Sequence, residues 1–215
     1  MRKTLRNALV VAVATIPVVG SAQMSSKPAT YITKEEVDTV NKQPGVDRQI
    51  RVVDIGPENF AVGVVHRGST RTPPPAGRGG GAGGGGGAAA AAQPCGMSGG
   101  AAPAGTPGGI SHDSQTEGYY IISGAGEMIT GGHIMNGRKS DPTASVTTEL
   151  NGPSCSGSIM GNDVVKRQVK VGDIIVIPAG TPHGWSDIPD HVDYLSFRPS
   201  QKVLTAGYVH PSIKK

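Results

Sequence analysis

The chain has 215 residues, with 20 lysines and arginines against 16 aspartates and glutamates, so its formal net charge is +4. This length allows one ordinary domain with appendages. The sequence contains no extended run of basic residues, which excludes nucleic-acid binding through a basic patch.

The first 22 residues have the organisation of a secretory signal peptide. Arg2, Lys3 and Arg6 precede an apolar run over 8–20, and small residues follow up to Ala22. This run is shorter than the roughly 20 apolar residues that span a bilayer. We therefore predict cleavage after Ala22 and a secreted or periplasmic protein with no membrane contact after cleavage. Losing the three basic residues would lower the formal net charge from +4 to +1.

A linker with one short helix is expected over 23–48. Thr33 and Glu36 fit a capping box, and Ile32 and Val37 are placed for a hydrophobic staple across the helix start. The sequence predicts a helix over 34–41 that packs on the outside of the domain and ends before a Pro-Gly pair.

The rest of the chain predicts short strands separated by turn residues. They are expected at 49–55 and 60–66, and then at 118–123, 127–130, 133–135, 164–171, 173–177, 183–186 and 192–198. Many short strands with frequent turns indicate an all-β barrel or sandwich, here spanning 49–205. The last segment, 206–215, is predicted to be a loosely attached tail.

A Gly/Ala/Pro-rich stretch over 72–109 interrupts this domain. Its 38 residues include 15 glycines, 10 alanines and 6 prolines. This composition cannot bury enough apolar surface to offset ordering entropy, so a disordered loop insertion is predicted. Cys95 lies within it, and Cys155 lies in a Gly/Pro/Ser-rich segment, 151–157, that we expect to be a loop. In an oxidising compartment the two could form a disulfide, and two separate thiols are the alternative.

Two segments carry the residues suited to chemistry. In the first, His112 is followed by Glu117 at the start of a predicted strand and by Gly124. In the second, Gly172, Pro178 and Gly180 surround a strand and a tight turn, after which His183, Trp185 and Asp187 alternate onto one strand face. Two such units can bring two imidazoles and a carboxylate together.

The spacing of these residues resembles the two motifs of the cupin superfamily, which are small double-stranded β-helix barrels. Gly172, Pro178, Gly180 and His183 match the second cupin motif, with Asp187 where that motif has Asn. His112, Glu117 and Gly124 match the first motif. Ile110 stands where that motif has its first His, and its leading Gly is also missing.

The resemblance implies an all-β, cupin-type double-stranded β-helix that binds one divalent metal through His112, Glu117 and His183. Two histidines and one carboxylate also suit non-haem Fe(II) on chemical grounds, and Mn, Ni and Zn are compatible. Ile110 in place of a ligand leaves a more open, apolar side to the site, for which Gln115 and His133 are weaker substitute candidates. The histidines outside the two motifs are expected to be packed or on the surface: His66, His133, His191 and His210.

Three functions remain open on the sequence. The first is a metal-dependent enzyme acting on a small organic molecule, most plausibly an oxygenase-type oxidoreductase. The second is a non-enzymatic module that binds a sugar or another small molecule, and the third is a metal-free structural barrel. Catalytic residues are unknown, although Tyr119 and Asp187 are placed to assist proton transfer. Tyr119 and Trp185 either line a substrate pocket or pack in the core. The resemblance also allows a homodimer.

Overall fold

The computed structural model describes residues 28–71, 93–200 and 202–213. The predicted signal peptide and the 72–92 part of the predicted insertion lie outside the described residues. The fold below is that of the compact unit Tyr31–Lys215. Its elements are α1 (Lys34–Asn41), β1 (Asp47–Asp54), β2 (Asn59–Gly68), β3 (Pro94–Cys95), β4 (Gly108–His112), β5 (Glu117–Thr130), β6 (His133–Lys139), the π-helix η1 (Val146–Asn151), β7 (Ser154–Met160), β8 (Val165–Lys170), β9 (Ile174–Ile177), β10 (His183–Asp187) and β11 (His191–Ser200).

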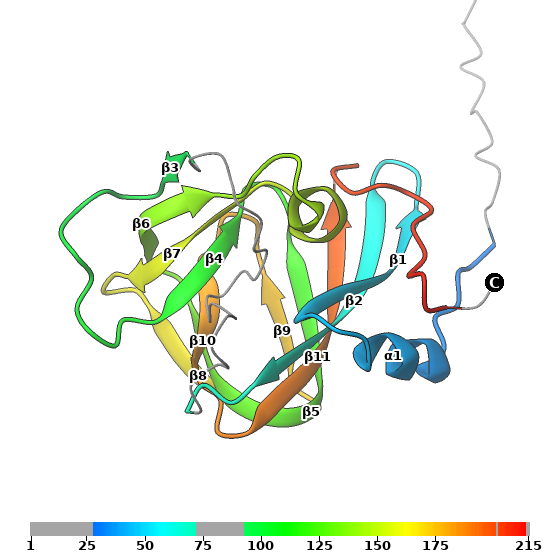
Figure 1. Cartoon of the computed structure of the whole chain (residues 1–215), viewed down its shortest axis with the longest axis horizontal. Coiled ribbons are helices and arrows are strands. Elements are labelled where there is room, and N and C mark those ends of the chain that lie inside the picture. The colour runs from blue at the N-terminus through cyan, green and yellow to red at the C-terminus, as the bar shows by residue number, and fades with distance from the viewer. Residues whose placement is uncertain (1–27, 72–92, 201, 214–215) are drawn as a thin grey trace, which may run out of the picture. The chain divides into compact units, whose positions relative to one another are not determined.

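All the named strand pairs are antiparallel and belong to one connected sheet (Figure 1). The order is β1-β2-β11-β5-β10-β4-β7-β6-β3, with β8 and β9 also paired to β5. The all-β class expected from the sequence is therefore confirmed. Among the described residues, no helix is long and apolar enough to cross a bilayer.

The long strand β5 joins the two halves of this sheet. Its first part pairs with β9 and β11, and its second part pairs with β8 and β10. Two separate strands were predicted here, because the glycines around Gly124 suggested a break. The strand instead continues through Gly124, whose φ is +69°, and a Cβ at this position would lie 2.0 Å from the carbonyl oxygen of His191. Glycine thus permits a change of direction within one strand.

The main core lies along β5 and takes residues from both halves of the sheet. Its buried members are Val65, Tyr119, Ile121, Met128, Val169, Ile177, Trp185, Ile188, Val192 and Tyr194. A second cluster covers the outside of β1 and β2, where Val40 of α1 packs with Ile50, Val64 and Ile213. The helix begins with the predicted capping box, because the side chains of Thr33 and Glu36 each accept a hydrogen bond from the other's backbone N–H. Its outer position is confirmed.

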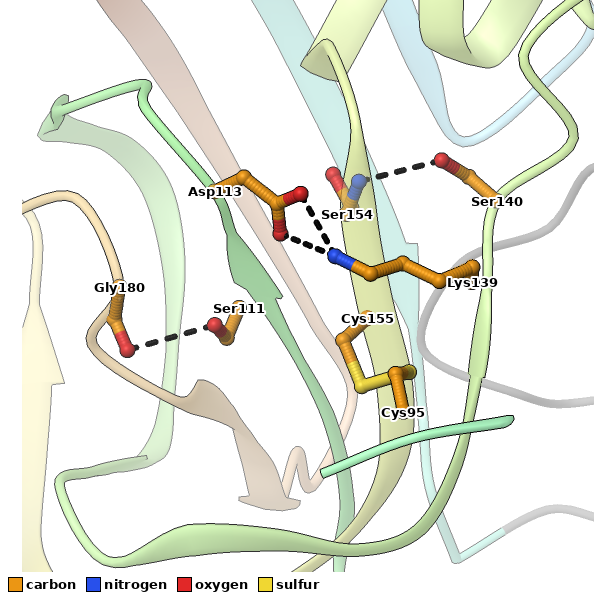
Figure 2. The surroundings of a disulfide bond; sticks show 8 residues. All are labelled: Cys95, Ser111, Asp113, Lys139, Ser140, Ser154, Cys155 and Gly180. Carbon is orange, nitrogen blue, oxygen red and sulfur yellow. Dashed lines mark hydrogen bonds and ion pairs between the residues drawn. A yellow bond between two sulfur atoms is a disulfide. The ribbon is translucent and has the colours of Figure 1, made fainter. Parts of the chain in front are cut away.

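The end of the predicted insertion is ordered by its contacts. Cys95 forms a disulfide with Cys155 of β7 (Figure 2), and Met97 donates its N–H to the carbonyl oxygen of Ile134. Residues 108–112 then enter the sheet as β4, beside β7. The prediction of disorder is therefore wrong for 93–109. The prediction that 151–157 is a loop is wrong from Ser154 onward, because that residue begins β7.

The C-terminal segment is also more firmly held than its composition suggested. Gly207 donates its N–H to the carbonyl of Val52, and His210 donates its N–H to the carbonyl of Ile50. Tyr208 accepts a backbone hydrogen bond from Val52, and Ile213 is buried beside α1. The expectation of a loosely attached tail is wrong for 206–213, since this segment runs along β1.

Candidate metal centre

The turn between β9 and β10 brings the two sequence motifs together. Ile177, the last residue of β9, pairs with Glu117 at the start of β5. In the following turn, Gly180 donates its N–H to the carbonyl oxygen of His112 at 2.7 Å. The chain then enters β10 at His183, which is paired with Ile110 of β4. The second motif thereby fixes the backbones of all three predicted ligands relative to one another.

The side chains of His112, Glu117 and His183 converge at this point, as the motifs predicted. One nitrogen or oxygen atom from each lies within 4.8 Å of the others, and all three residues are buried. The Nε2 atom of His112 lies 3.2 Å from Oε2 of Glu117, and Nε2 of His183 lies 3.1 Å from the same oxygen. Two imidazoles and a carboxylate at these separations are a set that can hold a metal ion.

The Nδ1 atoms of His112 and His183 point away from Glu117, and each has a hydrogen-bond partner that determines which ring nitrogen carries the proton in the neutral ring. Ser154 donates its hydroxyl proton to the carbonyl of Gly152 at 2.9 Å, so it accepts a hydrogen bond from Nδ1 of His112 at 2.7 Å. Nδ1 of His183 lies 3.0 Å from the carbonyl oxygen of Thr181, which can only accept. In the neutral rings each Nε2 therefore carries a lone pair. Such outer hydrogen bonds are typical of histidines that bind metals.

Glu117 is held as a carboxylate by a buried cation. Arg198 of β11 donates from Nε to Oε1 of Glu117 at 2.7 Å, and Ser196 donates to the same oxygen at 3.3 Å. Burial by itself raises the pKa of Glu117, but the charge of Arg198, together with His112 and His183, brings that pKa well below its ordinary value of 4.5. Oε1 is thus occupied, and Oε2 faces the two histidines.

Tyr119 completes the surroundings of this carboxylate. Its hydroxyl donates to Oε2 of Glu117 at 2.6 Å, and its ring lies 4.3 Å from that of Tyr194 between centroids. Burial and then the charge of Glu117 raise the pKa of Tyr119 well above 10.0, so the phenol keeps its proton. Tyr119 therefore acts here as a hydrogen-bond donor to the candidate site.

Arg198 itself is part of a wider buried network. Besides Glu117 it contacts Asp47 through Nη2 and Gln49 through Nη1. The sequence analysis did not predict Arg198. In the structure, alternate residues of β11 are buried from Val192 to Ser200, and Arg198 is one of them. A buried charged residue requires a partner of opposite charge, and Arg198 has two, Glu117 and Asp47.

The other residues considered in the sequence have mixed outcomes. Tyr119 and Trp185 both line the cavity at the site and also belong to the main core, so both interpretations hold. Asp187 forms an ion pair with Arg71 at 2.6 Å and lies outside the cavity lining. Gln115 and His133 do not line the cavity either, so neither replaces the ligand that is lacking at Ile110.

The cavity at the site has a volume of about 20 Å³. This is room for one water molecule or one ion, and not for an organic molecule, unless neighbouring side chains move. Polar residues beyond the three predicted ones also line it, among them Asp47, Arg67 and Asn151. Ile110 lines it too, so its apolar side chain faces the site as the first motif implied.

The sequence matches no family model and no curated protein. Several solved structures are similar in fold. An uncharacterised Klebsiella pneumoniae protein with a double-stranded β-helix domain is 16% identical, with 81% of this chain and 94% of that chain covered and a TM-score of 0.36. The Drosophila melanogaster CENP-C cupin domain is 10% identical, with 70% and 74% covered and a TM-score of 0.30. An oxalate oxidase is 14% identical, with 75% and 54% covered and a TM-score of 0.29.

Cupin and double-stranded β-helix proteins are thus among the structures to which this fold is similar. They belong to the superfamily that the two motifs resemble. At these identities the likeness concerns the backbone alone, so the chemistry proposed below rests on the side chains of this chain.

Replacing Arg198 should be strongly destabilising. Arg198→Met would leave Glu117 buried without its cation and remove the ion pair to the partly buried Asp47, and breaking such a buried pair costs about 3–5 kcal/mol. Arg71→Met is the matched control, because its ion pair with Asp187 is largely exposed and should contribute about 0–1 kcal/mol. Urea unfolding of the chelator-treated proteins measures both. A loss for Arg198→Met no larger than that for Arg71→Met would contradict the role given to this pair.

The stability of the chelator-treated protein should fall as the pH is lowered below about 4.5. In this range the unfolded chain protonates Glu117 while the folded protein, with its lowered pKa, does not. The contribution of Glu117 to the free energy of unfolding is therefore complete above the pKa of this residue in the unfolded chain. It is lost as the pH falls toward the pKa of Glu117 in the folded protein. Glu117→Gln should make the dependence of melting temperature on pH between 5 and 3 shallower, and Asp187→Asn should change it less. Equal slopes for wild type and Glu117→Gln would contradict the lowered pKa of Glu117 in the folded protein.

Proposed function

We propose that this barrel binds one divalent metal ion through Nε2 of His112, Nε2 of His183 and Oε2 of Glu117. The observation that supports this best is the hydrogen bonding of the two Nδ1 atoms, to Ser154 and to the Thr181 carbonyl. In the neutral rings this leaves a lone pair on each Nε2, and each Nε2 lies 3.1–3.2 Å from Oε2 of Glu117. Electron pairs that face one another at this separation repel unless a cation lies among them.

A protonated histidine is the alternative cation, and the geometry disfavours it for His183. Nε2 of His183 is buried and makes no hydrogen bond within the described residues, although Oε2 of Glu117 is only 3.1 Å away. A proton on this nitrogen would therefore be poorly directed at the carboxylate. A metal ion has no such requirement of alignment along an N–H bond.

We further propose that the bound ion serves a small organic molecule in an oxygenase-type reaction. When bound, a metal of the Fe, Mn, Ni or Zn group would supply Lewis acidity and open coordination positions. The protein's own contribution is to hold the donors. Arg198 keeps Glu117 ionised, Ser154 and Thr181 orient the rings, and Tyr119 donates a hydrogen bond to Oε2.

A non-enzymatic role is the second candidate, and the small cavity favours it. A volume of about 20 Å³ leaves little space for a substrate beside an ion, so the barrel would bind a metal and a small ligand without turnover. A metal-free structural barrel is also consistent with the Arg198–Glu117 pair, which already neutralises the carboxylate. The metal content of the purified protein distinguishes the metal-free barrel from the enzyme and from the non-enzymatic binding protein.

Metal analysis of the purified protein tests the proposal. We expect about one divalent ion per chain in the wild type and almost none in His183→Ala, which removes one of the three donors. His66→Ala is the control, because His66 lies on the surface beside Asp193, and it should keep the wild-type content. Near-zero metal in all three proteins after incubation with Fe, Mn, Ni and Zn salts would overturn the proposal. Oxygen uptake over a panel of small organic molecules then separates the enzyme from the binding protein.

We also propose that the protein is exported. The motif for this, residues 1–22, lies outside the described residues, and the Cys95–Cys155 disulfide supports an oxidising destination. Expression of the full chain in a bacterium with two membranes should yield protein in the periplasmic fraction or the medium. Mass spectrometry should then find an N-terminus at Gln23. Cytoplasmic protein that retains Met1 or Arg2 would show that the prediction is wrong.

A further inference from the structure

The structure points to a fourth protein donor at this site. Building on the proposed metal site, we infer that Asn151 contributes its side-chain oxygen to the ion held by His112, Glu117 and His183. Asn151 lines the same cavity as these three residues and is only 9% exposed. Its Oδ1 atom is buried and has no hydrogen-bond partner in the described part of the chain.

A buried amide oxygen without a partner is an unusual feature. Leaving such a group unsatisfied costs about 1–3 kcal/mol, and most buried polar atoms are therefore paired. An amide oxygen is only an acceptor, so the missing partner is a hydrogen-bond donor or a cation. The cavity is about 20 Å³ and is lined by Asn151 as well as by the three proposed ligands, so it has room for about one ion. One ion would satisfy Oδ1 of Asn151 together with the unpaired Nε2 of His183.

The local backbone explains how Asn151 reaches this position. It is the last residue of the π-helix η1, which is held at its start by Thr147, whose hydroxyl donates to the carbonyl of Asp141 at 2.6 Å. Gly152 follows with φ +66°, and the chain then enters β7 at Ser154, the residue that orients His112. Short π-helices occur often at functional sites. A single junction therefore carries both Asn151 and the partner of His112.

As a fourth donor, Asn151 would also compensate for the ligand that is missing on the apolar side of the site. Ile110 lines the cavity next to His183 and offers no donor. With Asn151 the protein set becomes two nitrogens and two oxygens, with a single negative charge on Glu117. Such a set is more favourable to hard, oxygen-preferring ions such as Mn²⁺ than one with a third imidazole.

Two substitutions of Asn151 with opposite expected effects test this. Mn²⁺ affinity is measured by calorimetry on chelator-treated protein, and Co²⁺ absorption spectra report changes in the ligand set. Asn151→Leu should weaken Mn²⁺ binding about 10–100-fold, and Asn151→Asp, which keeps an oxygen and adds charge, should bind at least as tightly as wild type. Asn59→Leu is the matched control. Asn59 is also buried, donates its amide to the carbonyl of Leu204 at 2.6 Å and does not line the cavity, so affinity should stay within about threefold of wild type.

The outcomes separate this inference from the function on which it rests. Failure of the wild type to bind any tested ion would overturn the proposed metal site itself. Binding by the wild type with equal affinity in Asn151→Leu would overturn only the role of Asn151. Equal weakening in Asn151→Leu and Asn151→Asp, with matching losses of melting temperature without metal, would show a purely structural role and also overturn it. If Asn151→Leu does not fold, Asn151→Asp decides, because weakened binding or a Co²⁺ spectrum identical to wild type contradicts the inference.

Discussion

The ion pair between Glu117 and Arg198 is the interaction on which the interior of the barrel depends. Both side chains are about 1% exposed, and an isolated carboxylate could not stay ionised at such a position. Arg198 contacts only Oε1, through Nε at 2.7 Å, and directs its remaining nitrogens to Asp47 and Gln49. The pair thus stabilises the charge of Glu117 and leaves Oε2 facing the histidines, where it is available to a further cation.

Because Oε1 of Glu117 contacts Arg198 and Oε2 faces the histidines, a metal-free barrel and a metal-binding barrel differ in what lies beside Oε2. In a metal-free barrel, a proton on Nε2 of either histidine would have to supply the positive charge that faces Oε2 of Glu117. The Nδ1 atoms of His112 and His183 are hydrogen-bonded away from this carboxylate, to Ser154 and Thr181. In the neutral rings the Nε2 lone pairs therefore face the centre. Such an arrangement is understandable if another positive species belongs there.

The sequence predicted the three converging residues because their placement is largely local. The turn after β9 needs Pro178 and Gly180 at fixed spacing from His183, and its contact with His112 follows from the same turn. Arg198 and Asn151 were not predicted, because they reach the cavity from β11 and η1, which lie outside both motifs. No short-range pattern links β11 or η1 to the site, and only the pairing of β11 with β5 and the path of the chain after η1 bring them there.

The glycines caused most of the errors in the predicted fold, for a related reason. A high glycine content indicates that an isolated segment can adopt many conformations. Whether the segment is ordered in the folded protein depends on its tertiary contacts. In β7, Gly157 has no room for a side chain, because a Cβ would lie 2.7 Å from the Ile134 side chain and from the carbonyl oxygen of Met135. Glycine there indicates close packing of strands. The same holds for Gly109 in β4, where a Cβ would lie 2.2 Å from the side chain of Ile159.

The disulfide connects this close packing to the candidate site. The predicted insertion returns to the barrel through β3 and enters β4, whose last residue is His112. The bond from Cys95 to Cys155 fixes the chain before β4 begins, on the strand that also carries Ser154 (Figure 2). Because Ser154 orients the ring of His112, one strand both anchors the insertion and sets the direction of a proposed ligand.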